Sequence, residues 1–186
     1  MSDDGPARLS PAARAALPRL ARDAIAAHLA GRRSRPPCDV DDLRQVRGAF
    51  VTLRRRDNGE LRGCIGVVEP SQPLAETVAE MAVAAATSDP RFPPVRAGEF
   101  DELTLDVSVL TPPAPIRPGD VVVGRHGLSL HCAGRRGLLL PQVPEEHGWD
   151  RAQFLEALCR KAGLPAGAWQ REDARLFGFE AEVVGE

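Results

Sequence analysis

The sequence predicts an α+β protein in which a mainly antiparallel sheet is flanked by helices. The helical and strand patterns come in the order helix, hairpin, helix, strands, helix, strand, without the regular strand-helix alternation of a parallel sheet. Gly-containing turns separate several short strand patterns, as is typical of antiparallel neighbours. With 186 residues, 43% of them hydrophobic, the chain can build one substantial core or a core with a smaller lobe.

A first helix is predicted over residues 10–30. Ser10 is a good N-cap, and Pro11 suits the first helical position because its missing N–H has no partner there. Gly31 follows as a stop signal. Residues 1–9 are expected to form a disordered N-terminus. The apolar residues recur near helical spacing at Leu17, Leu20, Ile25 and Leu29.

A β-hairpin is predicted next, with strands over 49–53 and 61–68. Asn58 and Gly59 are the residue pair that a type I′ turn prefers. This hairpin places Cys64 in the middle of its second strand, between Gly63 and Gly66. Glycine inside a strand often marks a bulge or a close approach of another backbone.

The middle of the chain predicts a second helix and a half-buried strand. The helix follows Pro73, continues to about Thr87 and ends at the proline-rich segment 89–94. Apolar and polar residues then alternate over 103–109, which is the pattern of a strand with one buried face.

The remaining third predicts short strands, one helix and a closing strand. The proline-rich segment 112–118 resembles a linker and can mark a smaller lobe over about 112–148, within a single domain spanning 10–184. Short strands are expected at 121–123, 128–132 and 138–140. A helix begins at Asp150, where Gln153 completes a capping box, and a strand covers 176–184.

Composition narrows the class of function. A net charge of −2 gives no electrostatic reason to expect a nucleic-acid partner or an anionic membrane. No apolar stretch is long enough to span a bilayer and no secretory signal is visible, so a cytoplasmic location is expected. The four cysteines are widely spaced, without the spacing of a zinc site, so free thiols and no metal are expected. The chain has no iron–sulfur, dinucleotide or phosphate-loop motif, so no cofactor is expected.

Two segments carry the strongest candidates for chemistry. Cys64 is a candidate nucleophile, with Arg62 as the nearby cation that would favour its thiolate. The two would share one strand face only if no bulge lies between them. The alternative for Cys64 is a small buried hydrophobic residue. Asp89, Arg91 and Phe92 lie in a proline-stiffened loop, where they either bind a ligand or form a structural turn.

Two further candidates lie later in the chain. His126, in a glycine-flanked turn, is either a base or ligand contact or a solvated turn residue. Gln142, after Pro141, can offer its amide to a ligand. His131 and Cys132 are adjacent in a predicted strand, so their side chains point to opposite faces and cannot chelate together.

The segment Leu61-Arg62-Gly63-Cys64-Ile65-Gly66 resembles the signature hexapeptide of the AMMECR-one domain family, known from the AmmeMemoRadiSam system. Five further blocks resemble that family in order, at 50–53, 89–94, 107–111, 139–143 and 161–164. The resemblance implies a two-lobed α+β fold with a cleft near the hexapeptide, and a Memo-like protein and a radical SAM protein as partners. It brings no established activity.

Together these observations give two hypotheses of function. In the first, a small-molecule or substrate cleft surrounds Arg62 and Cys64, with Gly63, Gly66 and the candidates of the 89–94 loop, His126 and Gln142 as binding residues. A thiol-dependent enzyme of unknown reaction class is one form of this hypothesis. In the second, the same cleft serves a non-catalytic protein-binding or accessory module.

Overall fold

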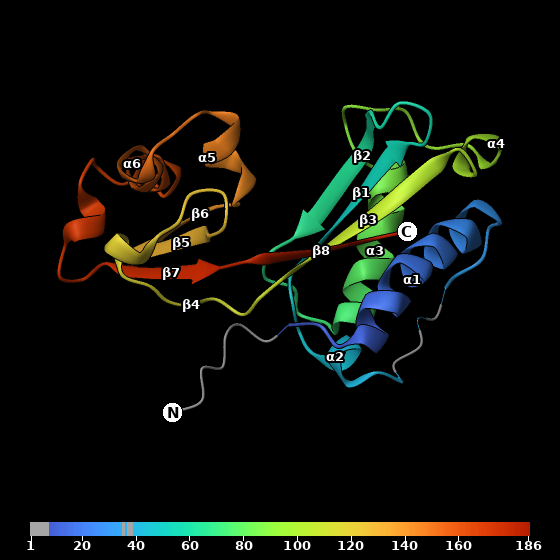
Figure 1. The fold of residues 1–186 in the computed structure, drawn as a ribbon, viewed down its shortest axis with the longest axis horizontal. Helices are drawn as coiled ribbons and strands as arrows, with labels where there is room; N and C mark the ends of the chain where they lie inside the picture. The colour runs from blue at the N-terminus through green and yellow to red at the C-terminus, as the bar shows by residue number, and fades with distance from the viewer. Residues whose placement is uncertain (1–7, 35, 37–38) are drawn as a thin grey trace. The chain divides into compact units, whose positions relative to one another are not determined.

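The computed structural model describes residues 8–34, 36 and 39–186, and it confirms the predicted α+β class (Figure 1). The chain forms two compact units. The first contains the described residues up to Leu110 together with Glu182–Glu186, and the second is the continuous segment Thr111–Ala181. The second unit begins at the proline-rich segment that the sequence singled out, but it extends past residue 148 because later residues complete its sheet.

The first unit is built on a four-stranded sheet with the order β2-β1-β3-β8. The central strand β1 (Ala49–Arg55) pairs antiparallel with both β2 (Leu61–Val67) and β3 (Leu103–Leu110), and Val51 lies opposite Ile65 on one side and Val107 on the other. Strand β8 (Ala181–Gly185) is the other edge of the sheet. Strand β2 is therefore the opposite edge strand, and no other strand of the described residues pairs with its outer side.

Helices α1 (Pro11–Leu29) and α3 (Leu74–Thr87) pack side by side on one face of this sheet (Figure 1). Ser10 caps α1 as predicted, because its Oγ accepts the N–H of Ala13 at 3.3 Å. Leu9, expected in the disordered N-terminus, is instead buried, and its N–H donates to Glu182. Short helices α2 (Asp41–Arg44) and α4 (Ala97–Phe100) complete the unit. The core contains Leu17, Ile25, Leu53, Leu74, Val78, Leu103 and Leu105.

The turn between β1 and β2 is not the predicted type I′ turn. Among the described residues other than glycine, only Ala133 has a positive φ, so Asn58 does not adopt the conformation that type I′ requires. Gly59, at φ 72°, is the left-handed residue of a longer connection, and Asn58 Oδ1 accepts the N–H of Glu60 at 2.9 Å. Asn58 therefore stabilises this connection through its side-chain hydrogen bond and not through a left-handed backbone conformation.

The second unit holds a four-stranded antiparallel sheet with the order β4-β7-β5-β6. Its strands are β4 (Ala114–Pro115), β5 (Gly127–Cys132), β6 (Arg135–Leu139) and β7 (Arg175–Phe179). Helix α6 (Arg151–Lys161) packs against β5 and β6 and has the predicted capping box between Asp150 and Gln153. Helix α5 (Gln142–Glu146) and two 3-10 turns, η1 (Pro118–Asp120) and η2 (Ala168–Gln170), complete this unit.

Three strand predictions in this half need correction. Residues 121–123 are not a strand, because η1 leads into a turn in which His126 Nδ1 accepts the N–H of Val122 at 3.0 Å. The strand predicted at 138–140 lies earlier, at Arg135–Leu139. The strand predicted over 176–184 is two strands that belong to different sheets and are separated by Glu180, whose backbone hydrogen-bonds Thr111 in both directions.

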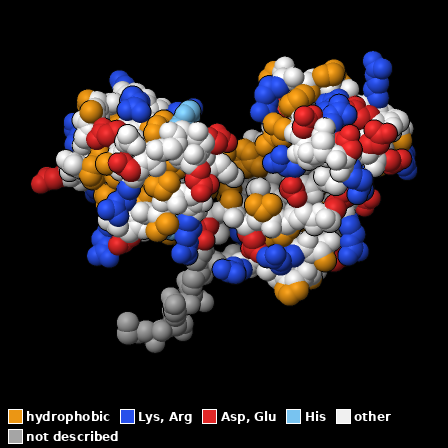
Figure 2. All heavy atoms as spheres, turned by 45° about the horizontal axis from the view of Figure 1, so that its top comes forward, with side chains coloured by type: hydrophobic (Ala, Val, Ile, Leu, Met, Phe, Trp, Pro, Cys, Tyr) orange, Lys and Arg blue, Asp and Glu red, His pale blue; other side chains and the backbone are white. Residues whose placement is uncertain are grey.

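Some sequence predictions lie outside this description. Most of the predicted N-terminal segment 1–9 and Cys38, one of the four predicted free thiols, fall outside the described residues. In the part of the chain that the structure describes, no helix is long and apolar enough to cross a membrane. Basic and acidic side chains are interspersed on the face that Figure 2 shows.

Candidate functional site

The free edge of β2 and the loop after α3 form the candidate site. The loop residue Asp89 accepts the backbone N–H of Cys64 at Oδ2, over 2.8 Å. Arg91 donates from Nη2 to the carbonyl oxygen of Cys64 over 3.4 Å. The loop therefore occupies the place of a neighbouring strand at Cys64 and satisfies backbone groups that an edge strand leaves open.

Asp89 is a buried carboxylate that holds Arg91 in place. Its Oδ1 accepts from Nε (3.0 Å) and from the backbone N–H (3.1 Å) of Arg91, and its Oδ2 accepts from Nη2 over 2.7 Å. These bonds from Arg91, with the N–H of Cys64, hold the pKa of Asp89 far below its usual range, although burial opposes the shift. Asp89 thus stays charged and orients Arg91. It is not a general base.

A bulge at Arg62 separates the two residues that the sequence paired. Leu53 lies opposite Gly63 and Arg54 opposite Leu61, which leaves Arg62 as the extra residue of β2. The Arg62 side chain turns to Glu99, donating from Nε to Oε1 over 2.6 Å and from Nη2 to Oε2 over 3.0 Å. Cys64 lies beside Thr52, whose hydroxyl donates to its sulfur at 3.3 Å. The guanidinium that contacts Cys64 is therefore that of Arg91.

A pocket of about 570 Å³ lies next to this bulge. Arg62 is 4% exposed there, and its Cζ lies 5.8 Å from the centre of the Phe92 ring, while Arg91 Cζ lies 5.5 Å from the same ring. The Arg62 bond is the main reason that the pKa of Glu99 is lowered. We call this cavity the Arg62 pocket. It is lined by Arg55, Glu60, Leu61, Arg62, Phe92, Pro93, Pro94, Arg96 and Glu99.

Close packing explains why positions 63 and 66, on either side of Cys64, are glycine. A Cβ on Gly63 would overlap the carbonyl oxygen of Ala85 in α3, and a Cβ on Gly66 would overlap the ring of Phe50. The first allows the helix to approach the sheet closely, and the second accommodates an aromatic ring on the neighbouring strand. Their predicted part in binding stays a prediction.

The structure brings Arg62, Cys64, Asp89, Arg91 and Phe92 together at one sheet edge. His126 and Gln142 belong to the second unit. His126 stabilises its own turn, and burial is the main reason that its pKa is lowered. Gln142 is the exposed first residue of α5.

Sequence reasoning missed Glu99 and Thr52. Glu99 comes from a four-residue helix that has no periodic pattern, so no local signal links it to Arg62. Thr52 could have been found from the hairpin register, because it lies directly opposite Cys64. Within the described residues, no group of three His, Cys, Asp or Glu side chains could hold a metal ion.

Comparison with known proteins places the chain in a family. The family model described as AMMECR1 matches residues 18–184. Protein MK0488 of Methanopyrus kandleri is 46% identical over 179 residues, which cover 91% of this chain and 86% of that protein. Protein MJ0810 of Methanocaldococcus jannaschii is 43% identical over 175 residues, covering 90% and 87%. The crystal structure of the uncharacterized protein PH0010 from Pyrococcus horikoshii matches with a TM-score of 0.70 at 46% identity, over 90% of this chain and 88% of that chain. The chain therefore belongs to the AMMECR1 family.

Proposed function

We propose that the protein binds a small anionic molecule in the Arg62 pocket. The observation that carries the proposal is the Nη1 of Arg62, which is buried and has no hydrogen-bond partner among the described residues. The other two nitrogens are taken by Glu99. A buried donor without a partner costs about 1–3 kcal/mol, more when it is charged, so a ligand acceptor at Nη1 would remove that cost.

The composition of the pocket supports an anion with an apolar body. Arg55, Arg62 and Arg96 line it together with Glu60 and Glu99, so cations exceed carboxylates by one. The apolar part of the wall is Leu61, Phe92, Pro93 and Pro94. A cavity of about 570 Å³ lies within the usual range of small-molecule sites. A carboxylate on a small aromatic or aliphatic body matches both parts of this wall.

A titration with benzoate and its uncharged analogue benzamide tests this function. We expect benzoate to raise the melting temperature and to bind in calorimetry, and benzamide to bind at least about tenfold more weakly, since it lacks the charge. Arg96→Gln should weaken benzoate severalfold. Arg160→Gln, on the exposed surface of α6, is the matched control and should leave binding unchanged. Equal binding of benzoate and benzamide, or full affinity in Arg96→Gln, would refute an anion site in this pocket.

A thiol-dependent reaction at Cys64 is the second candidate function. It is favoured by two observations: the Thr52 hydroxyl donates to the Cys64 sulfur over 3.3 Å, which orients the side chain, and Cys64 is partly exposed and so open to a reagent. Iodoacetamide labelling near pH 7 in a Cys38→Ser background tests it, with the buried Cys132 and Cys159 as internal controls. We expect Cys64 to label first and Thr52→Val to slow its labelling. If Cys64 labels no faster than the same thiol in denaturant, the reactive-thiol function fails.

The family resemblance adds partners to the proposal, a Memo-like protein and a radical SAM protein. An accessory module would present the Arg62 pocket and its rim to one of them. A pull-down with purified partners tests this, comparing the wild type with Arg96→Gln and the α6 control Arg160→Gln. Loss of capture in Arg96→Gln alone supports the accessory module. Equal capture by all three proteins excludes the pocket rim as the interface.

A further inference from the structure

The Arg62 pocket contains a carboxylate that an anion site does not use. Glu60 lines the pocket and is exposed. Its backbone is held in place, because its N–H donates to Asn58 Oδ1 over 2.9 Å and its carbonyl oxygen accepts the N–H of Arg55 over 2.9 Å. Within the described residues, the carboxylate of Glu60 makes neither a hydrogen bond nor an ion pair. It is therefore available to a cationic group of a ligand.

The second carboxylate of the pocket, that of Glu99, is already occupied. It accepts two hydrogen bonds from Arg62, at 2.6 and 3.0 Å, and its Oε1 lies 3.6 Å from Nη2 of Arg55. Glu99 thus fixes the arginines of the wall. The two carboxylates that line the pocket differ in their roles, and only Glu60 has its charge directed to no protein partner in the described structure.

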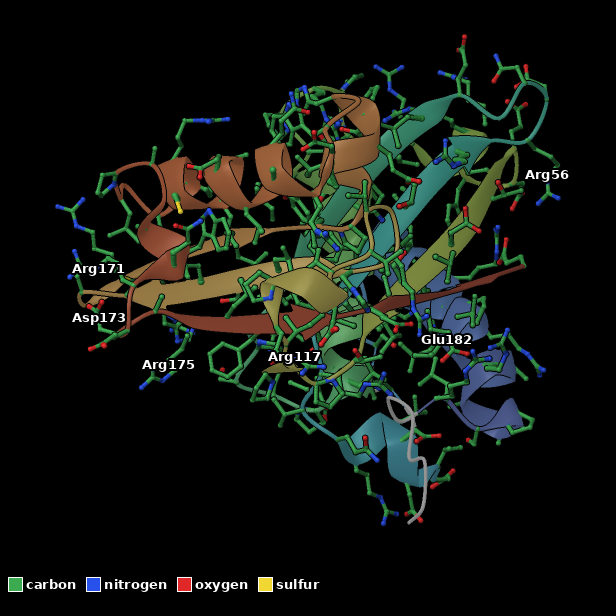
Figure 3. All side chains as sticks on the ribbon, turned by 60° about the vertical axis from the view of Figure 1, so that its left-hand side comes forward. Arg56, Arg117, Arg171, Asp173, Arg175 and Glu182 are labelled. Atoms are coloured by element: carbon green, nitrogen blue, oxygen red, sulfur yellow. The ribbon has the colours of Figure 1, made fainter. Side chains whose placement is uncertain are left out.

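Two arginines of the pocket can receive an anionic group. Nη1 of Arg62 is buried without a partner among the described residues, and Arg96 is exposed, with no side-chain hydrogen bond or ion pair in that same part of the chain. Arg56 follows Arg55 in the sequence but lies at the end of the hairpin, beside the start of β3 (Figure 3), where its Nη2 donates to the carbonyl oxygen of Leu103 over 3.3 Å. Arg56 therefore does not belong to the wall.

The cationic and anionic groups of the wall lie close to each other. Glu60 and Arg62 are two residues apart, so their Cα atoms are separated by at most about 7 Å. A ligand that meets both side chains needs an anionic and a cationic group only a few bonds apart. The apolar part of the wall, with Leu61 and the partly exposed ring of Phe92, belongs to the same cavity.

We propose that the ligand of the Arg62 pocket is an α-amino acid with an apolar side chain. Its carboxylate accepts from Arg62 and Arg96, its ammonium group donates to Glu60, and its side chain lies against Phe92. The inference rests on the proposed function, because it keeps the anion contact and adds a cation contact.

The free carboxylate of Glu60 favours an amino acid over two related ligands. A simple carboxylic acid leaves Glu60 without a partner and places two like charges in one cavity, which repel each other. The end of a peptide is also a poorer match, because the terminal residue of a chain carries either the free ammonium group or the free α-carboxylate. A free α-amino acid carries both on one carbon atom.

Calorimetry of the whole protein with three probes of one shape tests the assignment. The probes are L-phenylalanine, 3-phenylpropanoate, which lacks the ammonium group, and 2-phenylethylamine, which lacks the carboxylate. We expect L-phenylalanine to bind about three- to fivefold more tightly than 3-phenylpropanoate, because an exposed ion pair contributes about that factor at most. The amine should bind at least about tenfold more weakly than L-phenylalanine, because the contact to Arg62 is missing.

Glu60→Gln isolates the cation contact. The preference for L-phenylalanine over 3-phenylpropanoate should disappear in this variant, while the affinity for 3-phenylpropanoate should not fall. Glu146→Gln, which removes an exposed carboxylate of α5, is the matched control and should keep the preference. The two enantiomers of phenylalanine should also differ in affinity, because the site contacts three groups on the α-carbon.

The outcomes separate this inference from the proposed function. Equal binding of L-phenylalanine and 3-phenylpropanoate, an unchanged preference in Glu60→Gln, or equal binding of the two enantiomers would overturn the amino-acid assignment while the anion site stands. If neither benzoate nor any of these probes binds, the proposed function fails and this inference fails with it.

Discussion

The buried guanidinium of Arg62 depends on one carboxylate. The Arg62 side chain is 5% exposed and that of Glu99 is 21% exposed, and two hydrogen bonds join them. The buried positive charge of Arg62 is tolerated because the carboxylate of Glu99 compensates for the hydration that the guanidinium has lost. Removing the charge of Glu99 alone would leave an unpaired charge in the protein interior.

We therefore expect Glu99→Gln to lower the free energy of unfolding by about 2–3 kcal/mol. Asp106→Asn is the matched control, because Asp106 pairs with Arg54 at 3.7 Å on a surface where both side chains are well exposed. Exposed pairs of this kind contribute about 0–1 kcal/mol. Urea unfolding of the three proteins measures the difference. Equal effects of the two substitutions would show that the burial of Arg62 is not supported by Glu99.

Asp89 makes stability depend on pH in the acid range. Because its pKa is lower in the folded protein than in the unfolded chain, its contribution is fully present above the unfolded value of about 4 and is lost as pH falls below it. We expect Asp89→Asn to lower the free energy of unfolding by about 2 kcal/mol at pH 7, because the substitution weakens the charge-assisted hydrogen bonds from Arg91. The difference in the free energy of unfolding between the wild type and Asp89→Asn should become smaller as pH is lowered from about 5 to about 2. Urea titrations at several pH values measure this difference, with Asp57→Asn, at an exposed position, as the control that should cost less than about 0.5 kcal/mol at pH 7.

At the residue scale, the sequence predicts most of the residues that meet at the edge of β2 better than how they are paired. Cys64, between two glycines, and Arg62 stand out in a strand, and Asp89 and Arg91 stand out in a stiff loop. Their contacts depend on a bulge and on the approach of the loop to a sheet edge. Both are long-range features that no local pattern encodes. The pairing of Arg62 with Glu99 is long-range for the same reason.

At the scale of elements, the contact between α3 and β2 sets a steric requirement on the signature strand. A methyl group on Gly63 would meet the backbone of Ala85, which cannot rotate away as a side chain can. We expect Gly63→Ala to destabilise the protein by about 3 kcal/mol through overpacking. Gly98→Ala, where a Cβ meets nothing within 4 Å, should change stability by less than about 0.5 kcal/mol. Thermal unfolding distinguishes the two, and a neutral Gly63→Ala would show that the helix can move.

The elements that local patterns encode strongly were predicted well, and those that depend on pairing were not. Helices α1 and α6 have caps and apolar stripes that a sequence displays directly. The strand predicted over 176–184 failed because its apolar alternation continues across β7 and β8. The change of sheet at Glu180 is produced by hydrogen bonds to Thr111, 69 residues away, which no periodicity contains.

At the scale of the whole molecule, two cores lie in one chain. The first is formed around Leu53, Leu103 and Leu105, and the second around Leu128, Leu130 and Phe154. Both tryptophans of the sequence, Trp149 and Trp169, pack against the second core, and the chain has no tyrosine. The long helices α1 and α3 belong to the first unit. Tryptophan fluorescence therefore follows the second unit, while far-UV circular dichroism is dominated by the first.

This division of signals allows the cooperativity of the two units to be measured. If the cores unfold separately, Leu105→Ala should move the circular dichroism transition to lower urea and leave the fluorescence midpoint unchanged, whereas Leu130→Ala should do the reverse. Each truncation removes a fully buried leucine and should cost its own unit about 2–5 kcal/mol. Coincident transitions that move together in both variants would show that the second unit, although continuous in sequence, has no stability independent of the first. Separate transitions would allow each unit to be perturbed by itself, because substitutions in one unit would leave the other folded.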